Sequence, residues 1–219
     1  MKKAFSFVLA SALVASVAVT AFADDKKAPA AVDTKKVEGK AEAMKAEVGK
    51  AAPNFTLKTT EGKEWSLTDA AGKIVVLQWC NPECPACVNV STDGTVAKMM
   101  TDLKAIDSNV MVVYINSSAA RPESLSATAG YLKEHKIEVP ALLDTEGKVG
   151  MMYGARTTPH CYVIDSKGVL RYQGAIDDAK GGKKGEMNYV VNAVKQIKAG
   201  ETVSPDTTKP YGCSVKYKK

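Results

Sequence analysis

Apolar residues after about position 48 fall into short continuous runs, separated by segments with a period near 3.6 residues. The runs at 73–79, 110–115 and 161–165 are nearly uninterrupted, which is typical of strands buried on both faces of a sheet. A shorter run at 141–144 predicts a further strand. Because these runs alternate with helical patterns, the sequence predicts an α/β domain whose central mixed sheet is flanked by helices on both faces.

The spacing of apolar residues between the runs predicts the helices. One helix is expected to begin at Pro85 and to continue through Ile106. Other helices are predicted over about 122–135, 148–153 and 187–199, and hairpins over about 54–67 and 161–174. We therefore place the folded domain at 48–199 and an irregular tail, which contains Cys213, at 200–219.

The N-terminus has a different pattern. Two lysines precede an uncharged, largely apolar run over 4–20, and the small-x-small motif 21–23 follows it. This pattern predicts a cleavable signal peptide at 1–23, because the run is short for a bilayer span of roughly 20 residues; a retained anchor is the alternative. Residues 24–47 are predicted to form a flexible charged linker. We expect a protein exported to the periplasm of a Gram-negative-type bacterium, with no stable membrane insertion after cleavage.

Charge and cysteine content narrow the function. The net charge is +6, but the basic residues are scattered and are not interleaved with aromatic ones, so no nucleic-acid partner is expected. The chain has five cysteines. An odd number in an exported protein leaves at least one thiol unpaired, shared or metal-bound. Three of the five lie within CNPECPAC, at 80–87, which argues for chemistry over a purely structural framework.

This cluster directly follows the predicted strand at 73–79. Pro85 suits the first position of a helix, which places Cys84 at the N-cap. There the helix dipole and unpaired N–H groups favour the thiolate. Cys87 lies one turn further on and faces the same way, so Cys84 and Cys87 can close a disulfide ring. We expect Cys84 to be an exposed nucleophile and Cys87 to be a more buried resolving thiol.

A second segment of interest is ARTTPHCYVID at 155–165, in which Pro159 directly precedes a predicted strand. A proline in this position is a candidate for a cis peptide bond, and an ordinary trans proline is the alternative.

Together these segments resemble the thioredoxin superfamily. The chain is most similar to the redoxin branch, of the alkyl hydroperoxide reductase and thiol-specific antioxidant type. Within it, the motifs NPECP, LLDTEGKVGMMYGARTTPH, YQGAIDD, NYV and TKPYGCSVKY resemble an exported, peroxiredoxin-like subgroup. The resemblance implies a thioredoxin-like fold with Cys84 as the attacking thiolate. It also implies that Pro159 is cis and packs against the active sulfurs, and that the backbone of Thr158 receives a partner chain as an added strand.

Two residues depart from the peroxidase pattern of that branch. Peroxidatic members usually have threonine where this chain has Asn81, and proline where it has Leu77. The subgroup also often lacks a cysteine equivalent to Cys87. We therefore expect a thiol–disulfide oxidoreductase or thiol peroxidase without a cofactor beyond its redox-active disulfide. Its substrates would be protein thiols and disulfides or a peroxide, and an external thiol would reduce it.

The roles of four further residues stay open. Cys213 could resolve Cys84, form a structural link to Cys161 or be a lone thiol. Cys161 could equally be a small buried apolar side chain, and Cys80 a spectator. His160 could assist proton transfer or be an ordinary surface histidine.

A different function also fits these residues. The Cys80-x-x-x-Cys84-Pro85 spacing resembles copper chaperones of cytochrome oxidase assembly, which are also thioredoxin-like. Cys80, Cys84, Cys87 and His160 would then bind Cu(I), which prefers soft sulfur ligands and imidazole. A zinc clip is less well supported, since the chain has no second C-x-x-C and no paired histidines. A non-catalytic thioredoxin-like binding module is the remaining alternative.

Overall fold

The computed structural model describes residues 45–180 and 184–218. The predicted signal peptide at 1–23 and most of the predicted linker at 24–47 lie outside the described residues. Among the residues described, no helix combines the length and the apolar character that crossing a membrane requires.

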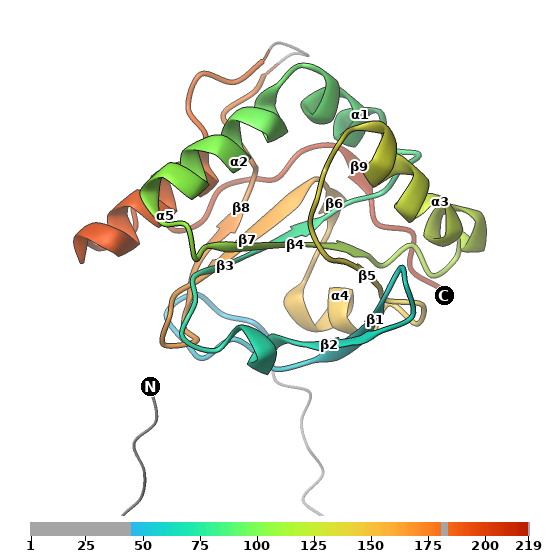
Figure 1. Cartoon of the computed structure of the whole chain (residues 1–219), viewed down its shortest axis with the longest axis horizontal. Helices are drawn as coiled ribbons and strands as arrows, with labels where there is room; N and C mark the ends of the chain where they lie inside the picture. Colours follow the sequence, from blue (N-terminus) through green and yellow to red (C-terminus); the bar gives the residue numbers. More distant parts are fainter. Residues whose placement is uncertain (1–44, 181–183, 219) are drawn as a thin grey trace, which may run out of the picture. The chain divides into compact units, whose positions relative to one another are not determined.

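Within the described residues, seven strands form one mixed sheet in the order β2-β1-β5-β4-β3-β7-β8 (Figure 1). The strands are β1 (Thr56–Thr59), β2 (Glu64–Ser66), β3 (Val75–Trp79), β4 (Met111–Asn116), β5 (Ala141–Leu143), β7 (His160–Ile164) and β8 (Leu170–Gly174). β3 runs parallel to β4 and antiparallel to β7, and β4 runs parallel to β5. The sheet and both predicted hairpins are confirmed.

Helices cover both faces of the sheet, as predicted (Figure 1). They are the short 3₁₀ helix η1 (Leu67–Ala70) and the α-helices α1 (Pro85–Thr92), α2 (Thr95–Ile106), α3 (Pro122–Glu134), α4 (Lys148–Tyr153) and α5 (Tyr189–Ala199). α1, α2, α3 and α5 pack on one face and α4 packs on the other. β3 separates the two cores, because its alternating side chains, such as Val76 and Leu77, point to opposite faces.

The predicted single helix from Pro85 to Ile106 is wrong. It is divided into α1 and α2 at Gly94, whose φ of 85° is in the left-handed region that helices do not contain. The carboxylate of Asp93 accepts a hydrogen bond from the Thr95 N–H (2.8 Å) and fixes the turn. The dipeptide Asp93-Gly94 is a turn signal that the apolar spacing alone overlooked.

The C-terminal tail packs on the domain. It is largely irregular, as predicted, but it contains the short strand β9 (Cys213–Ser214). β9 pairs antiparallel with β6 (Thr157–Thr158), a short strand that the apolar pattern also did not predict. The side chain of Val215 is buried in the core beneath α4. The tail is therefore part of the folded structure and lies beside the loop that contains Pro159.

Candidate active site

Cys84 lies at the N-cap of α1, as predicted. Its backbone is extended (φ −84°, ψ 116°), and Pro85 occupies the first helical turn. The Cys84 N–H donates to the carbonyl oxygen of Asn81 (3.0 Å), which closes the turn that follows β3. The strand, the turn and the proline together direct the Cys84 side chain to the N-terminus of the helix.

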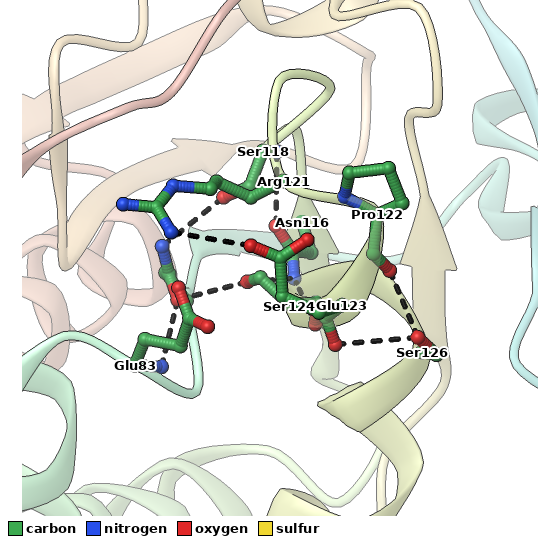
Figure 2. Close-up of polar contacts among 9 residues, drawn as sticks. Glu83, Asn116, Ser118, Arg121, Pro122, Glu123, Ser124 and Ser126 are labelled. Atoms are coloured by element: carbon green, nitrogen blue, oxygen red, sulfur yellow. Dashed lines mark hydrogen bonds and ion pairs between the residues drawn. The ribbon is translucent and has the colours of Figure 1, made fainter.

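The side chain of Asn81 fixes the turn before Cys84. It is 3% exposed, and its Oδ1 accepts hydrogen bonds from the Glu83 N–H (2.7 Å) and the Ser124 hydroxyl (2.9 Å). Its Nδ2 donates to the Ser118 hydroxyl (3.2 Å). Figure 2 shows Ser118 and Ser124 in this network, together with Asn116 at the end of β4. Asn81 occupies the position at which peroxidatic members of the branch usually have threonine. Its side-chain amide holds the loop before Cys84 in place.

Replacing this amide should destabilise the protein. In Asn81→Ala the buried Ser118 hydroxyl loses its donor and the buried Ser124 hydroxyl loses its acceptor, so we expect the free energy of unfolding to fall by about 2–4 kcal/mol. Urea denaturation of the reduced protein measures the change. The exposed Asn109 provides a matched control, and Asn109→Ala should change stability by less than about 0.5 kcal/mol. Equal effects of the two substitutions would contradict this role of Asn81.

The loop before β7 meets Cys84. The Thr158-Pro159 peptide bond is cis, as the family resemblance implied. The Cys84 Sγ lies 2.9 Å from the carbonyl oxygen of Thr158. Two segments 74 residues apart in sequence are thereby brought together at one sulfur.

Hydrogen bonds stabilise the Cys84 thiolate. Hydrogen bonding from the Cys87 thiol lowers the pKa of Cys84 most. Burial raises this pKa, and hydrogen bonding from the side chains of Thr158 and Cys213 lowers it further. Only the protonated Cys84 thiol can donate to the Thr158 carbonyl, so this contact favours the protonated form. The hydrogen bonds donated to the thiolate outweigh it, and the pKa of Cys84 is lowered to about 4. Burial raises the pKa of Cys87 well above its usual value, and the adjacent thiols Cys80 and Cys84 add to this. The two thiols therefore have the opposite ionisation preferences of a nucleophile and a resolving residue.

The expectation that Cys84 is exposed is wrong. Its residue surface is only 1% exposed. The C-terminal tail covers it, because Cys213 pairs with Thr158, whose carbonyl contacts the Cys84 sulfur, and Gly212 lies against Thr158 and Ala86. Gly212 was not predicted to be a site residue, although a glycine directly before Cys213 indicates a close backbone approach.

The other buried cysteines lie behind the pair. Cys80 is buried in the same core as Cys87 and contributes to the raised pKa of the Cys87 thiol. Cys161 is fully buried in the same core, and burial raises the pKa of its thiol, as expected for a small apolar side chain. All five cysteines are among the described residues and each is a free thiol. The structure places Cys213 beside Cys84, whereas the alternative role would have linked it to Cys161.

Tyr131 of α3 also contacts the site. Its hydroxyl donates to the backbone carbonyl of Cys87 (2.9 Å) and forms a further hydrogen bond with Ser91 (2.7 Å). Both contacts join α3 to α1 and hold the helix that contains the resolving cysteine. Sequence analysis missed this residue, because a tyrosine at a helical core position carries no distinctive pattern.

His160 is not on the cysteine side of the sheet. Adjacent residues of a strand point to opposite faces, and Cys161 lies in the core with Cys84. The His160 ring instead packs on Tyr162 (centroids 4.6 Å apart), and its Nδ1 accepts from the Arg156 N–H (3.3 Å). Burial and the nearby Arg156 charge lower the pKa of His160 to about 4, so the imidazole is neutral at pH 7. The histidine is buried, which contradicts the ordinary surface position considered for it.

The structure does not assemble the four residues of the Cu(I) alternative. Across residues 45–180 and 184–218, no group of three or more His, Cys, Asp or Glu side chains is arranged to hold a metal ion. His160 is separated from the cysteines by the sheet, as its packing on Tyr162 shows. The arrangement of Cys84, Cys87 and Cys213 is that of thiols that can exchange disulfides.

Comparison with known proteins identifies the family. Residues 48–173 match the AhpC/TSA family. The chain belongs to this family. The match contains Cys84, Cys87 and the Thr158-Pro159 loop, and it confirms the predicted redoxin branch of the thioredoxin superfamily. It ends before α5 and the C-terminal tail, so the segment that covers Cys84 lies beyond the matched residues.

Individual relatives agree with this assignment. The chain is 30% identical over 130 residues to the thioredoxin-like protein YneN of Bacillus subtilis (strain 168), covering 56% of this chain and 68% of the relative. It is 28% identical over 126 residues to the thiol-disulfide oxidoreductase ResA of Bacillus thuringiensis subsp. konkukian, covering 57% and 67%. The crystal structure of hypothetical protein SMc02350 from Sinorhizobium meliloti 1021 superposes with a TM-score of 0.67 at 25% identity, covering 78% of this chain and 95% of that one. The fold is thioredoxin-like.

Proposed function

We propose that this protein is an exported thiol–disulfide oxidoreductase whose active centre is the Cys84–Cys87 dithiol. The observation that carries the proposal is the position of Cys84 at the N-cap of α1 with Cys87 buried one turn further on; the neighbouring Cys87 thiol lowers the pKa of Cys84, while burial raises that of Cys87. Membership of the AhpC/TSA family and similarity to a relative named thiol-disulfide oxidoreductase support the same class of reaction.

The reaction proceeds in two exchanges. The Cys84 thiolate attacks one sulfur of a substrate disulfide, a Cys84–substrate disulfide forms, and the other substrate sulfur leaves as a thiolate. Cys87 then loses its proton and attacks the Cys84 sulfur, which releases the second substrate thiolate and forms the Cys84–Cys87 disulfide. Two electrons pass from the dithiol to the substrate. An external thiol returns them to the enzyme, and the same steps in reverse oxidise a substrate dithiol.

Direct peroxide reduction is the less favoured activity. It would oxidise Cys84 to a sulfenic acid, which Cys87 would resolve with loss of water. Peroxidatic members of the branch that the chain resembles usually have threonine at the position of Asn81. Asn81 uses its amide to hold Glu83, Ser118 and Ser124 instead.

The N-terminal pattern supports export. The charged start, the apolar run and the small-x-small motif are typical of a secretory signal, and an oxidising compartment would suit a catalytic disulfide. Protein thiols and disulfides are the proposed substrates.

Trapping of an intermediate tests the proposal. In Cys87→Ser/Cys213→Ser the first exchange can occur but neither neighbouring thiol remains to attack the Cys84 sulfur, so a Cys84–substrate disulfide should accumulate. Incubation with a disulfide-containing protein such as insulin, followed by non-reducing mass spectrometry, should detect an adduct in Cys87→Ser/Cys213→Ser and turnover without an adduct in the wild type.

Cys161→Ala is the matched control, since this buried cysteine has no proposed step in the reaction. It should turn over without accumulating an adduct. Absence of both turnover in the wild type and adduct in Cys87→Ser/Cys213→Ser would rule out disulfide exchange as the function.

A further inference from the structure

The C-terminal tail occupies a strand position next to the nucleophile. β9 pairs antiparallel with β6, with Thr158 opposite Cys213 and Thr157 opposite Ser214. Within the described residues, β6 and β9 form a separate two-stranded sheet, so β9 is the strand that satisfies the β6 edge. An unpaired strand edge accepts an extended peptide as an additional strand. The tail therefore fills a site that could accept an external polypeptide.

Contacts on both sides of Cys213 hold it beside Cys84. Before it, the Tyr211 hydroxyl donates to the carboxylate of Asp177 (2.6 Å). After it, the Tyr217 hydroxyl donates to the carbonyl of Ala155 (2.8 Å). Since Cys213 is fixed from both directions, its position beside the active sulfur follows from the packing of the tail.

Gly212 permits the close approach. A Cβ atom at this position would lie 2.1 Å from the carbonyl oxygen of Thr158, and the φ of Gly212 is +104°. Both the space and the backbone conformation exclude a side chain. The residue before Cys213 is thus fitted to the carbonyl that also contacts Cys84.

Occlusion of Cys84 gives this arrangement a chemical consequence. The residue surface of Cys84 is 1% exposed, so a disulfide of another protein cannot reach its sulfur while the tail is in place. Cys213 is half-buried and pairs with Thr158, whose carbonyl oxygen lies 2.9 Å from the Cys84 sulfur. Cys213 therefore occupies the position that the cysteine of a polypeptide substrate paired with β6 would take.

We propose that the tail is an intramolecular substrate, in which Cys213 forms a disulfide with Cys84 and β9 occupies the client site along β6. This inference rests on the proposed exchange between Cys84 and Cys87. The client is then an extended, cysteine-containing polypeptide segment that displaces β9 and pairs with β6 in its place.

The internal exchange needs no added reactant. The Cys213 thiol loses its proton and attacks the Cys84 sulfur of the Cys84–Cys87 disulfide. The Cys84–Cys213 bond forms as the Cys84–Cys87 bond breaks, and Cys87 leaves as a thiolate that takes up a proton. No net oxidation occurs, because one disulfide replaces another.

The first test traps the internal disulfide. The reduced Cys87→Ser protein is treated with diamide, which accepts two electrons and two protons from a pair of thiols, and non-reducing peptide mapping locates the bond. We expect at least about half of the molecules to contain Cys84–Cys213 in the monomer. Cys87→Ser/Cys213→Ser should contain none. If Cys87→Ser forms no Cys84–Cys213 bond, the proposal is overturned.

The second test opens the site without removing a thiol. Gly212→Ala should push the tail away from Thr158, and alkylation of Cys84 in the reduced protein should accelerate by about tenfold or more. Gly200 is a matched control, because it also has a positive φ but an added Cβ meets nothing within 4 Å. An unchanged alkylation rate in Gly212→Ala, or an equal increase in Gly200→Ala, would count against occlusion by the tail.

The outcomes separate this inference from the proposed function. Insulin turnover without a Cys84–Cys213 bond in Cys87→Ser would leave the exchange function intact and refute the tail as a substrate. A Cys84–Cys213 bond in a protein without insulin turnover would support the tail as a partner of Cys84 and refute exchange with external proteins.

Discussion

Cys84→Ser is expected to reduce disulfide-exchange turnover by at least about a thousandfold, because a serine hydroxyl is not ionised at neutral pH and cannot form a disulfide. Both exchanges pass through the Cys84 sulfur, so no other thiol can substitute for it. Cys80 and Cys161 are buried, and burial raises the pKa of Cys87 and also that of Cys213, to about 11. The insulin turnover assay measures the loss.

The contrast with Cys87→Ser/Cys213→Ser makes this result specific. Both variants should stop turnover, but only Cys87→Ser/Cys213→Ser should retain the Cys84–substrate adduct. Cys161→Ala should retain most of the turnover and lose some stability through the vacated core volume. A Cys84→Ser protein that still forms an adduct would assign the attack to a different sulfur.

The local geometry of the active site could be predicted from the sequence because short-range rules determine it. Pro85 restricts the start of a helix, so Cys84 had to precede it as the N-cap. The apolar run over 73–79 similarly predicted a central strand, which β3 confirms. These features depend on neighbouring residues alone.

The opposite faces of β7 could also have been deduced. His160 and Cys161 are adjacent in one strand, so their side chains must point to different sides of the sheet. Cys84, Cys87 and Cys161 share one core, and this parity separates His160 from them. The Cu(I) site was predicted from sequence spacing alone, without the alternation of side chains along a strand.

The covered nucleophile could not be predicted in this way. β6 and β9 have two residues each, which is too short to produce an apolar alternation. Their pairing joins Thr158 to Cys213 across a large part of the chain. Packing of Tyr211 and Tyr217 positions the tail, and such contacts depend on the complete fold. A tail that appeared irregular in sequence therefore proved to be part of the site.

The ionisation of Cys84 should make the reduction potential depend unusually on pH. Its pKa of about 4 lies far below the ordinary value of 9.0, while the pKa of Cys87 is raised. Above about pH 4, reduction of the disulfide then takes up one proton in place of two. The potential should therefore fall by about 30 mV per pH unit up to at least about pH 9, compared with about 59 mV below pH 4.

The lowered pKa of Cys84 also determines how the stability of the reduced protein depends on pH. A pKa lowered in the folded state stabilises the reduced folded protein most above pH 9, and this contribution diminishes as the pH falls and is lost at about pH 4. Thiolate absorbance near 240 nm should show the corresponding titration step in the reduced wild type. Cys84→Ser should lack the step.

A pair of substitutions tests the physical cause. The largest contribution to the lowered pKa of Cys84 is the hydrogen bond from the Cys87 thiol. Cys87→Ser retains a donor, so the titration midpoint should stay low. Cys87→Ala removes the donor, and the midpoint should move upward toward 9. If both variants titrate at the wild-type pH, the helix N-terminus and the remaining donors must stabilise the thiolate without help from residue 87, and the proposed coupling of the two cysteines would have to be abandoned.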